Sequence, residues 1–154
     1  MTTVVFLHAP GKSPFDWQDV AEHLPPMWAV AAPALNNCAD EDTVFSAINR
    51  DALSVSDEPV VLVSAGRSAI AARAFQRRFP ARVSSVIAIE PQWTCSVFHR
   101  VISRSIPYVS ALSSMNVTGA EPVACKVPVV ELSAEETQYP AQCAAAVYRV
   151  VVGE

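Results

Sequence analysis

The residues best suited to chemistry in this chain surround one glycine. The segment Ser64-Ala65-Gly66-Arg67-Ser68 places one serine two residues before Gly66 and another two residues after it. A serine hydroxyl becomes a nucleophile when a base such as histidine lies within hydrogen-bond reach. His99 is the one histidine outside the first 25 residues. A pair of Ser64 or Ser68 with His99 is therefore one hypothesis for hydrolysis.

Each of these side chains also has a purely structural interpretation. Ser68 is expected to cap the helix that begins there. Ser64 is expected to be a small residue that lets a strand and a helix pack closely, and His99 to lie on an exposed helix surface. His23, near the end of a predicted helix, is expected to interact with the helix dipole.

Two other motifs carry less weight. Gly11-Lys12-Ser13 matches the end of a phosphate-binding P-loop, G-x-x-x-x-G-K-[ST], but Phe6 occupies the position of its first glycine.

The histidines and cysteines lack the spacings of metal ligands, so no metal and no other cofactor is expected. The four cysteines include no C-x-x-C pair and are expected to be reduced, mostly buried thiols: Cys38, Cys95, Cys125 and Cys143.

Gly66 is predicted to lie at a sharp turn between a strand and a helix. The β-branched run 60–63 is short and follows a polar, proline-containing segment, which is typical of a buried strand. Glycine suits the apex because it tolerates unusual backbone angles. The helix is expected to bury Ile70, Ala71, Ala74 and Phe75 and to turn Arg73, Gln76 and Arg77 elsewhere.

The rest of the chain alternates between strand and helix patterns. Strands are predicted over 3–7, 28–32, 60–63, 83–89 and 127–132. Helices are predicted over about 14–24, 42–54 and 68–78 and from Pro140 onward. Inward-facing positions are Phe15, Val20 and Leu24 in the first helix and Val44, Phe45, Ile48 and Leu53 in the second. This alternation favours an α/β three-layer sandwich with a five-stranded parallel sheet.

At these residues the chain resembles the α/β-hydrolase superfamily. The nucleophile elbow of that family, G-x-S-x-G, aligns with 64–68 and puts Gly66 at the nucleophile position. The segments 4–17, 28–33, 79–83 and 129–153 resemble the strands, loops and helices of the family core. The resemblance implies a reduced α/β-hydrolase core with the strand order 2-1-3-4-5, in one domain, 1–154. A shrunken cap region is expected at about 92–124, where weak patterns suggest helices near 97–102 and 109–115.

The resemblance also implies that three catalytic requirements are missing. Gly66 has no nucleophilic atom. Pro10 stands where a backbone N–H would complete the oxyanion hole, although the N–H of Arg67 remains. The loop 133–139, which would hold the base, has no histidine, and His8 matches a histidine that is structural in the family. No catalytic residue is therefore expected.

A ligand-binding site is expected at this turn even though the catalytic groups are missing. In open parallel sheets, ligands bind at the carboxyl ends of the strands, and the helix that starts near Arg67 offers free N–H groups and a positive dipole end. The predicted ligand is a small anion or an acyl group. A merely polar crevice with solvated Lys12 and Arg67 is the alternative. The predicted ligand-binding residues are His8, Pro10, Lys12, Ser64, Gly66, Arg67 and Ser68.

The amino-acid composition limits the classes of partner that the chain is expected to bind. The net charge is −4, the isoelectric point is near 5.3, and there is no basic run, which argues against nucleic-acid binding. No stretch reaches the roughly 18 apolar residues of a membrane span, and the N-terminus does not have the pattern of a signal peptide. A cytoplasmic protein is expected.

Three functional hypotheses follow. The first is a catalytically degenerate protein that binds a small ligand or a protein partner. The second is an active hydrolase of small esters or thioesters that uses Ser64 or Ser68 with His99. The third is a homodimer formed through apolar surface left by the short cap, with the candidate residues Trp93, Phe98, Ile106, Tyr108 and Leu112.

Overall fold

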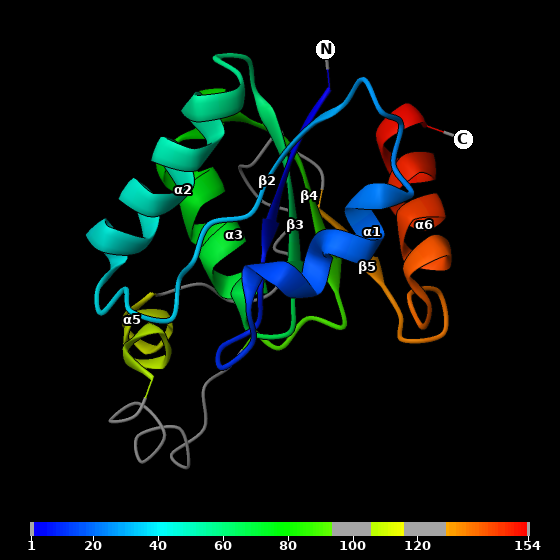
Figure 1. Cartoon of the computed structure of the whole chain (residues 1–154). Coiled ribbons are helices and arrows are strands. Elements are labelled where there is room, and N and C mark those ends of the chain that lie inside the picture. Colours follow the sequence, from blue (N-terminus) through cyan, green and yellow to red (C-terminus); the bar gives the residue numbers. More distant parts are fainter. Residues whose placement is uncertain (1, 94–105, 116–128, 154) are drawn as a thin grey trace.

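The computed structural model describes residues 2–93, 106–115 and 129–153, and these contain a five-stranded parallel sheet in the order β2-β1-β3-β4-β5 (Figure 1). The strands are β1 (Thr3–Leu7), β2 (Ala29–Ala31), β3 (Val60–Ala65), β4 (Val83–Ile89) and β5 (Val129–Leu132). The predicted strand order is confirmed. The predicted bounds of β1 and β4 also agree with the structure.

Strand register brings three connections to one edge of the sheet. Leu7 pairs with Ser64 and Ile89 pairs with Ala65, so β1, β3 and β4 end at nearly the same level. The loop after β1, the turn at Gly66 and the residue after β4 therefore meet at the carboxyl edge of the sheet.

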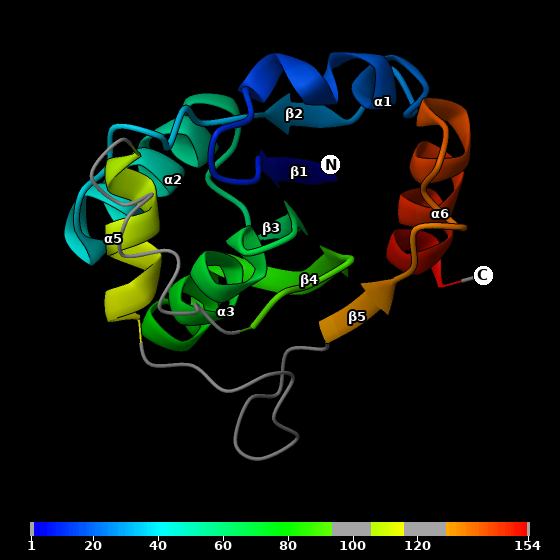
Figure 2. The same ribbon diagram turned by 90° about the horizontal axis from the view of Figure 1, so that it is seen from below.

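Helices cover both faces of the sheet (Figure 2). One face carries α2 (Glu41–Val55), α3 (Ser68–Arg78) and α5 (Pro107–Ser114); the other carries η1 (Pro14–Trp17), α1 (Gln18–Glu22) and α6 (Pro140–Val152). A short 3₁₀ turn, η2 (Pro80–Arg82), leads into β4. The three-layer arrangement that was predicted is thus present.

Each face has its own hydrophobic core because successive strand residues point to opposite sides of the sheet. In β1, Val5 and Leu7 pack with the α2, α3 and α5 side. Val4 and Phe6 pack with the α1 and α6 side, where Phe6 stacks on Trp17 with 4.7 Å between the ring centroids.

The first helical segment differs from the prediction at one position. Ser13 caps it with a capping box that includes Asp16, as its sequence indicates. Phe15, however, is 81% exposed, and Trp17 is buried in its place. Trp17 precedes Val20 by three residues, which places both on one side of a helix, whereas Phe15 precedes Val20 by five and points away.

In two further helices, the side chains that are buried differ from those predicted. Leu53 of α2 is exposed, and Ala52, four residues after Ile48, takes the inward position. In α3, the apolar positions are buried as predicted, but Arg73 and Gln76 are buried too, with Arg73 Nη1 donating to Gln76 Oε1 at 2.6 Å. Polarity alone therefore did not identify the exposed side of α3.

The helix suggested over 109–115 corresponds to α5, Pro107–Ser114. The helix suggested near 97–102 lies outside the described residues. No helix in the described ranges combines the length and hydropathy that a membrane span requires.

Candidate functional site

The turn between β3 and α3 has the predicted bend. Gly66 adopts a φ of +56°, in the left-handed region that side-chain-bearing residues rarely occupy. A Cβ placed on Gly66 would lie 3.7 Å from the Cβ of Ala9, an ordinary contact distance. The apex therefore has room for a Cβ atom. Glycine is favoured there because of the left-handed backbone angle, and not because neighbouring atoms are too close.

Backbone hydrogen bonds from the neighbouring strand fix this bend. The N–H of Gly66 donates to the carbonyl of Ile89 at 3.1 Å, and the N–H of Gln92 donates to the carbonyl of Gly66 at 3.1 Å. The segment that leaves β4 thus holds both sides of the apex residue. These bonds join peptide groups and do not involve a side chain at position 66.

The two serines beside the apex lie in the interior. Both are fully buried. The Ser68 hydroxyl donates to the carbonyl oxygen of His8 and also forms a 2.7 Å hydrogen bond with the hydroxyl of Tyr108. The expectation that Ser68 caps α3 is wrong, because Arg67 is the N-cap residue and no side-chain cap is present. Ser64 Oγ has no hydrogen-bond partner among the described residues.

His8 is buried at the end of β1 and both ring nitrogens are used. The N–H of Leu35 donates to Nε2 at 3.0 Å, and Nδ1 lies 2.9 Å from the carbonyl oxygen of Ala9. Because Nε2 accepts a hydrogen bond, the ring is neutral and Nδ1 is the donor. Burial lowers the pKa of His8, and the Ala9 carbonyl offsets part of that effect. This arrangement matches a structural histidine.

The other histidines provide no base at the apex in the described part of the chain. His23 Nδ1 lies 2.7 Å from the carbonyl of Asp19 at the end of α1, which agrees with the predicted contact to a helix terminus. His99 lies outside the described residues. In the loop after β5, Glu136 accepts hydrogen bonds from the N–H and the hydroxyl of Ser133.

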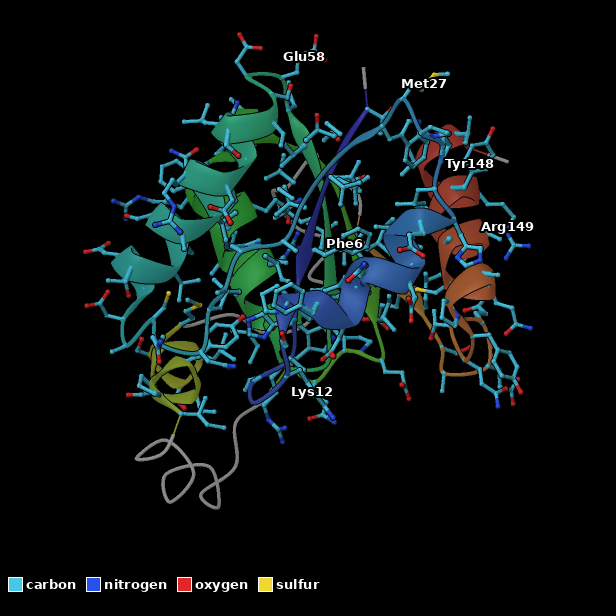
Figure 3. The ribbon with its side chains drawn as sticks, viewed as in Figure 1. Phe6, Lys12, Met27, Glu58, Tyr148 and Arg149 are labelled. Atoms are coloured by element: carbon cyan, nitrogen blue, oxygen red, sulfur yellow. The ribbon has the colours of Figure 1, made fainter. Side chains whose placement is uncertain are left out.

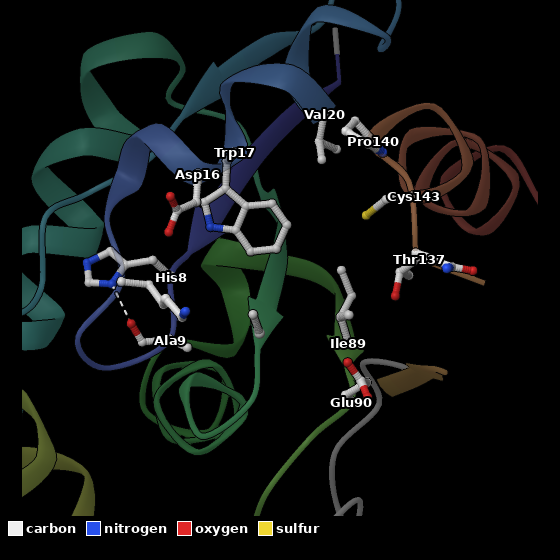
Figure 4. Close-up of a pocket in the computed structure, with 13 residues that line it drawn as sticks. His8, Ala9, Asp16, Trp17, Val20, Ile89, Glu90, Thr137, Pro140 and Cys143 are labelled. Carbon is white, nitrogen blue, oxygen red and sulfur yellow. Dashed lines mark hydrogen bonds between the residues drawn. The ribbon is translucent and has the colours of Figure 1, made fainter. Parts of the chain in front are cut away.

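Two clefts open at the carboxyl edge of the sheet. The larger, of about 450 Å³, lies on the α1 and α6 side (Figure 4). Its lining residues are His8, Ala9, Lys12, Asp16, Trp17, Val20, Ala65, Ile89, Glu90, Thr137, Gln138, Pro140 and Cys143. The smaller, of about 220 Å³, lies on the α5 side and is lined by Ala9, Pro10, Gly66, Arg67, Gln92, Ile106 and Val109.

The structure separates the predicted ligand-binding residues into three groups. His8 and Lys12 line the larger cleft, and Lys12 is exposed at the carboxyl edge of the sheet (Figure 3). Pro10, Gly66 and Arg67 line the smaller cleft. The buried Ser64 and Ser68 line neither cleft, so their hydroxyls do not meet Lys12 and Arg67 as predicted.

The larger cleft has an apolar floor and a charged rim. Trp17, Val20, Ile89 and Cys143 are buried apolar residues of its wall. Burial raises the pKa of Cys143 to about 11, so this thiol is protonated and unreactive at neutral pH. Among the exposed rim residues, Asp16 and Glu90 carry negative charge and Lys12 carries positive charge.

Sequence reasoning missed several residues of this region. Trp17 could have been found from its helical spacing to Val20. Glu90 directly follows a predicted strand, the usual position of a ligand-contacting residue. Tyr108, which bonds to Ser68, comes from a segment with a weak pattern, and nothing in its neighbours indicated the contact.

The described residues also bear on metals and on the dimer hypothesis. They contain no cluster of three or more histidine, cysteine, aspartate or glutamate side chains that could hold a metal ion. Tyr108 and Leu112 are buried against the α2 and α3 side, so these two residues do not form exposed apolar surface. Phe98 lies outside the described residues.

Comparison with known proteins identifies the fold. No protein-family model and no curated protein matches the sequence. Among solved structures, ClbQ from the colibactin NRPS/PKS pathway is similar over 99% of this chain and 97% of its own, with a TM-score of 0.70 and 7% identity.

Two other solved structures are longer than this chain. The thioesterase domain from the curacin biosynthetic pathway is similar with a TM-score of 0.54 and 22% identity, over 71% of this chain and 44% of its own. Naproxen esterase from Bacillus subtilis has a TM-score of 0.54 and 11% identity, over 84% of this chain and 65% of its own. The chain thus spans less than two-thirds of the length of these two neighbours. Together with these likenesses, the sheet order and the helices on both faces show that the chain has the α/β-hydrolase fold.

Proposed function

We propose that this chain is a catalytically inactive protein of the α/β-hydrolase fold that binds a small ligand with an apolar, acyl-like part. The observation that carries the proposal is Gly66. It occupies the apex of the elbow with a φ of +56° and has no reactive atom. The α/β-hydrolase fold places its nucleophile at this position, and the absence of a side chain on Gly66 supports the loss of catalysis.

The larger cleft supports the binding half of the proposal. A volume of about 450 Å³ falls within the range of small-molecule sites. Its apolar floor of Trp17, Val20 and Ile89 suits a short hydrocarbon chain, and its charged rim suits a polar end group. An acyl ligand combines these two parts.

An anionic ligand or a protein partner is a second form of the proposal. Arg67 lines the smaller cleft, and its backbone N–H, next to the start of α3, donates to no described acceptor. Sulfate titration followed by the amide signals of Arg67 and Ser68 tests this form, and no change at high sulfate concentration rejects it. Failure of both clefts to bind small molecules would leave a protein partner as the occupant.

Hydrolysis of small esters or thioesters is the competing function, and the thioesterase and esterase among the similar structures favour it. It requires Ser64 or Ser68 to act with His99. Both hydroxyls are buried, and that of Ser68 already bonds to His8 and Tyr108. These contacts support inactivity.

The decisive assay is p-nitrophenyl acetate hydrolysis by the unmodified protein, Ser64→Ala and Ser68→Ala, with Ser54→Ala as a control at a helix-surface serine. All four proteins are expected to hydrolyse the ester only at the background rate. Turnover by the unmodified protein that is lost in Ser64→Ala or Ser68→Ala alone, while the variant is still folded by circular dichroism, would establish the hydrolase instead.

A further inference from the structure

Glu90 has an unusual backbone conformation at the larger cleft. It immediately follows β4, its side chain is exposed, and it lines the cleft opposite Trp17 (Figure 4). Its φ is 45°, which makes it the one non-glycine residue with positive φ in the described ranges. This left-handed conformation is sterically unfavourable for any residue with a Cβ.

The neighbouring strands fix Glu90 in this conformation. Its N–H donates to the carbonyl of Leu132 in β5 at 2.8 Å. On either side along the chain, the carbonyl of Ile89 and the N–H of Gln92 both bond to Gly66. A glycine would fit this backbone with less strain, yet the chain places a carboxylate there, facing the cleft. Strained residues of this kind cluster at sites of function.

The charges of the rim define which ligand end group suits the cleft. Glu90 and Asp16 are acceptors with negative charge, and Lys12 is the one cation among the lining residues. A free carboxylate would meet two like charges and one opposite charge. A carboxamide of the same size carries no charge, and its N–H groups can donate hydrogen bonds to a carboxylate.

The wall of the cleft also contains a buried polar atom without a partner in the described part of the chain. Trp17 is 8% exposed, and its indole N–H has no acceptor among the described residues. Figure 4 shows the indole ring between Asp16 and Cys143, with its nitrogen on the Asp16 side. Surrounding atoms cover this nitrogen, so the amide carbonyl is not assigned to it, and the selection rests on the charges of the rim.

We propose that the larger cleft selects uncharged carboxamides with a short apolar chain over the corresponding carboxylic acids, with Glu90 as the specificity-determining acceptor of the amide N–H. This inference rests on the proposed function, because it names the end group of the ligand that the cleft binds. It assigns no reaction to Glu90.

The test compares hexanamide with hexanoate, two ligands of nearly equal size and shape. Each is titrated at pH 7 into the ¹⁵N-labelled protein, and binding is followed by the amide signals of Ala65 and Thr137 and by the indole signals. The variants are Glu90→Gln, Glu90→Gly and the control Glu41→Gln, which removes the same charge from α2 on the opposite face of the sheet.

We expect hexanamide to bind about tenfold more tightly than hexanoate, since hydrogen bonds to charged groups exceed neutral ones and like charges repel. Glu90→Gln should reduce this preference to about twofold or less, and Glu41→Gln should keep it. Glu90→Gly should also lose the preference while unfolding at an equal or higher temperature, because it relieves the backbone.

The remaining outcomes separate the inference from the proposed function. Hexanoate that binds in the cleft as tightly as hexanamide, or an amide preference that survives Glu90→Gln, overturns the inference and leaves the binding function standing. Shifts confined to Gly66, Arg67 and Gln92 place the ligand in the smaller cleft and also overturn it. Absence of binding by both compounds overturns the inference and the acyl-ligand proposal together.

Discussion

The Ser68 hydroxyl donates a hydrogen bond to the carbonyl oxygen of His8 and so joins the start of α3 to the end of β1. Tyr108 of α5 completes the link with its hydroxyl, 2.7 Å from Ser68 Oγ. Since Ser68 gives its proton to His8, Tyr108 is the donor to Ser68. Three segments that are distant in sequence therefore meet in one directed chain of hydrogen bonds.

Removal of this serine should destabilise the fold. In Ser68→Ala, the His8 carbonyl loses its donor and the buried Tyr108 hydroxyl loses its acceptor. We expect a loss of about 2 kcal/mol in the free energy of unfolding. Tyr108→Phe removes one donor and leaves Ser68 bonded to His8, so it should cost about 1 kcal/mol. Urea unfolding measures both values.

The double variant Ser68→Ala/Tyr108→Phe supplies the control for this pair. Its loss should be smaller than the sum of the single losses, because both single changes break the same hydrogen bond. Additive losses would show that the Ser68–Tyr108 hydrogen bond provides no coupling. A Ser68→Ala protein as stable as the unmodified one would show that the Ser68 hydroxyl contributes nothing to stability.

Stability should depend on pH through His8. The folded protein holds this ring neutral with a lowered pKa, whereas the unfolded chain takes up a proton near pH 6.5. The unfolded state therefore binds more protons below pH 6.5. The stabilisation is complete above that pH and is lost as the pH falls towards the lowered pKa of the folded state, with a slope of at most about 1.4 kcal/mol per pH unit.

Urea unfolding between pH 5 and 7.5 measures this slope, and His8→Gln should flatten it. An NMR titration of the His8 ring in the folded protein provides an independent measurement. A ring that titrates at or above pH 6.5 in the native state would contradict the prediction.

Substitution of Gly66 should destabilise the fold through backbone strain and not through steric contact with neighbouring atoms. Gly66→Ala forces a Cβ into a φ of +56° with its nearest neighbour at 3.7 Å, and we expect a loss of about 1–2 kcal/mol from the backbone alone. Gly11→Ala adds a tighter contact, 3.2 Å to Ile106 Cδ1, to a φ of +81° and should cost at least as much. A neutral Gly66→Ala in thermal unfolding would mean that the bend is relaxed.

The thiol of Cys143 should resist alkylation in the native protein. It is 3% exposed with a pKa of about 11, so at pH 8 only about one thiol in a thousand is ionised. Iodoacetamide should modify Cys143 far more slowly than the partly exposed Cys38 of the same sample, as read by peptide mass spectrometry. A Cys143 rate in the folded protein equal to that of Cys38, with no increase of the Cys143 rate in urea, would argue against burial.

Much of the fold could be predicted from the sequence because its signals are local. Runs of β-branched residues bounded by turn residues identified β1, β3 and β4. Strand–helix alternation then predicted a parallel sheet, and the resemblance to the α/β-hydrolase core supplied the strand order that is observed. The misplaced side chains are those whose burial depends on partners far along the chain. Arg73 and Gln76 look like surface residues in the helical pattern and are buried.

The site was less predictable, and for a physical reason. Sequence spacing placed Lys12, Arg67 and the two serines at one edge of the sheet, but it does not give the face to which each side chain points. Lys12 and Arg67 line different clefts. Ser68 is buried and forms a hydrogen bond with Tyr108. The conformation of Glu90 is set by hydrogen bonds to neighbouring strands and has no local signature.

The backbone bonds that join Gly66 to the segment after β4 have a consequence for the residue at the apex. They hold the apex through peptide groups. A left-handed residue is most relaxed as glycine. Glycine therefore adopts the conformation of this turn at no steric cost, and the hydrogen bonds that hold the turn do not require a side chain at position 66.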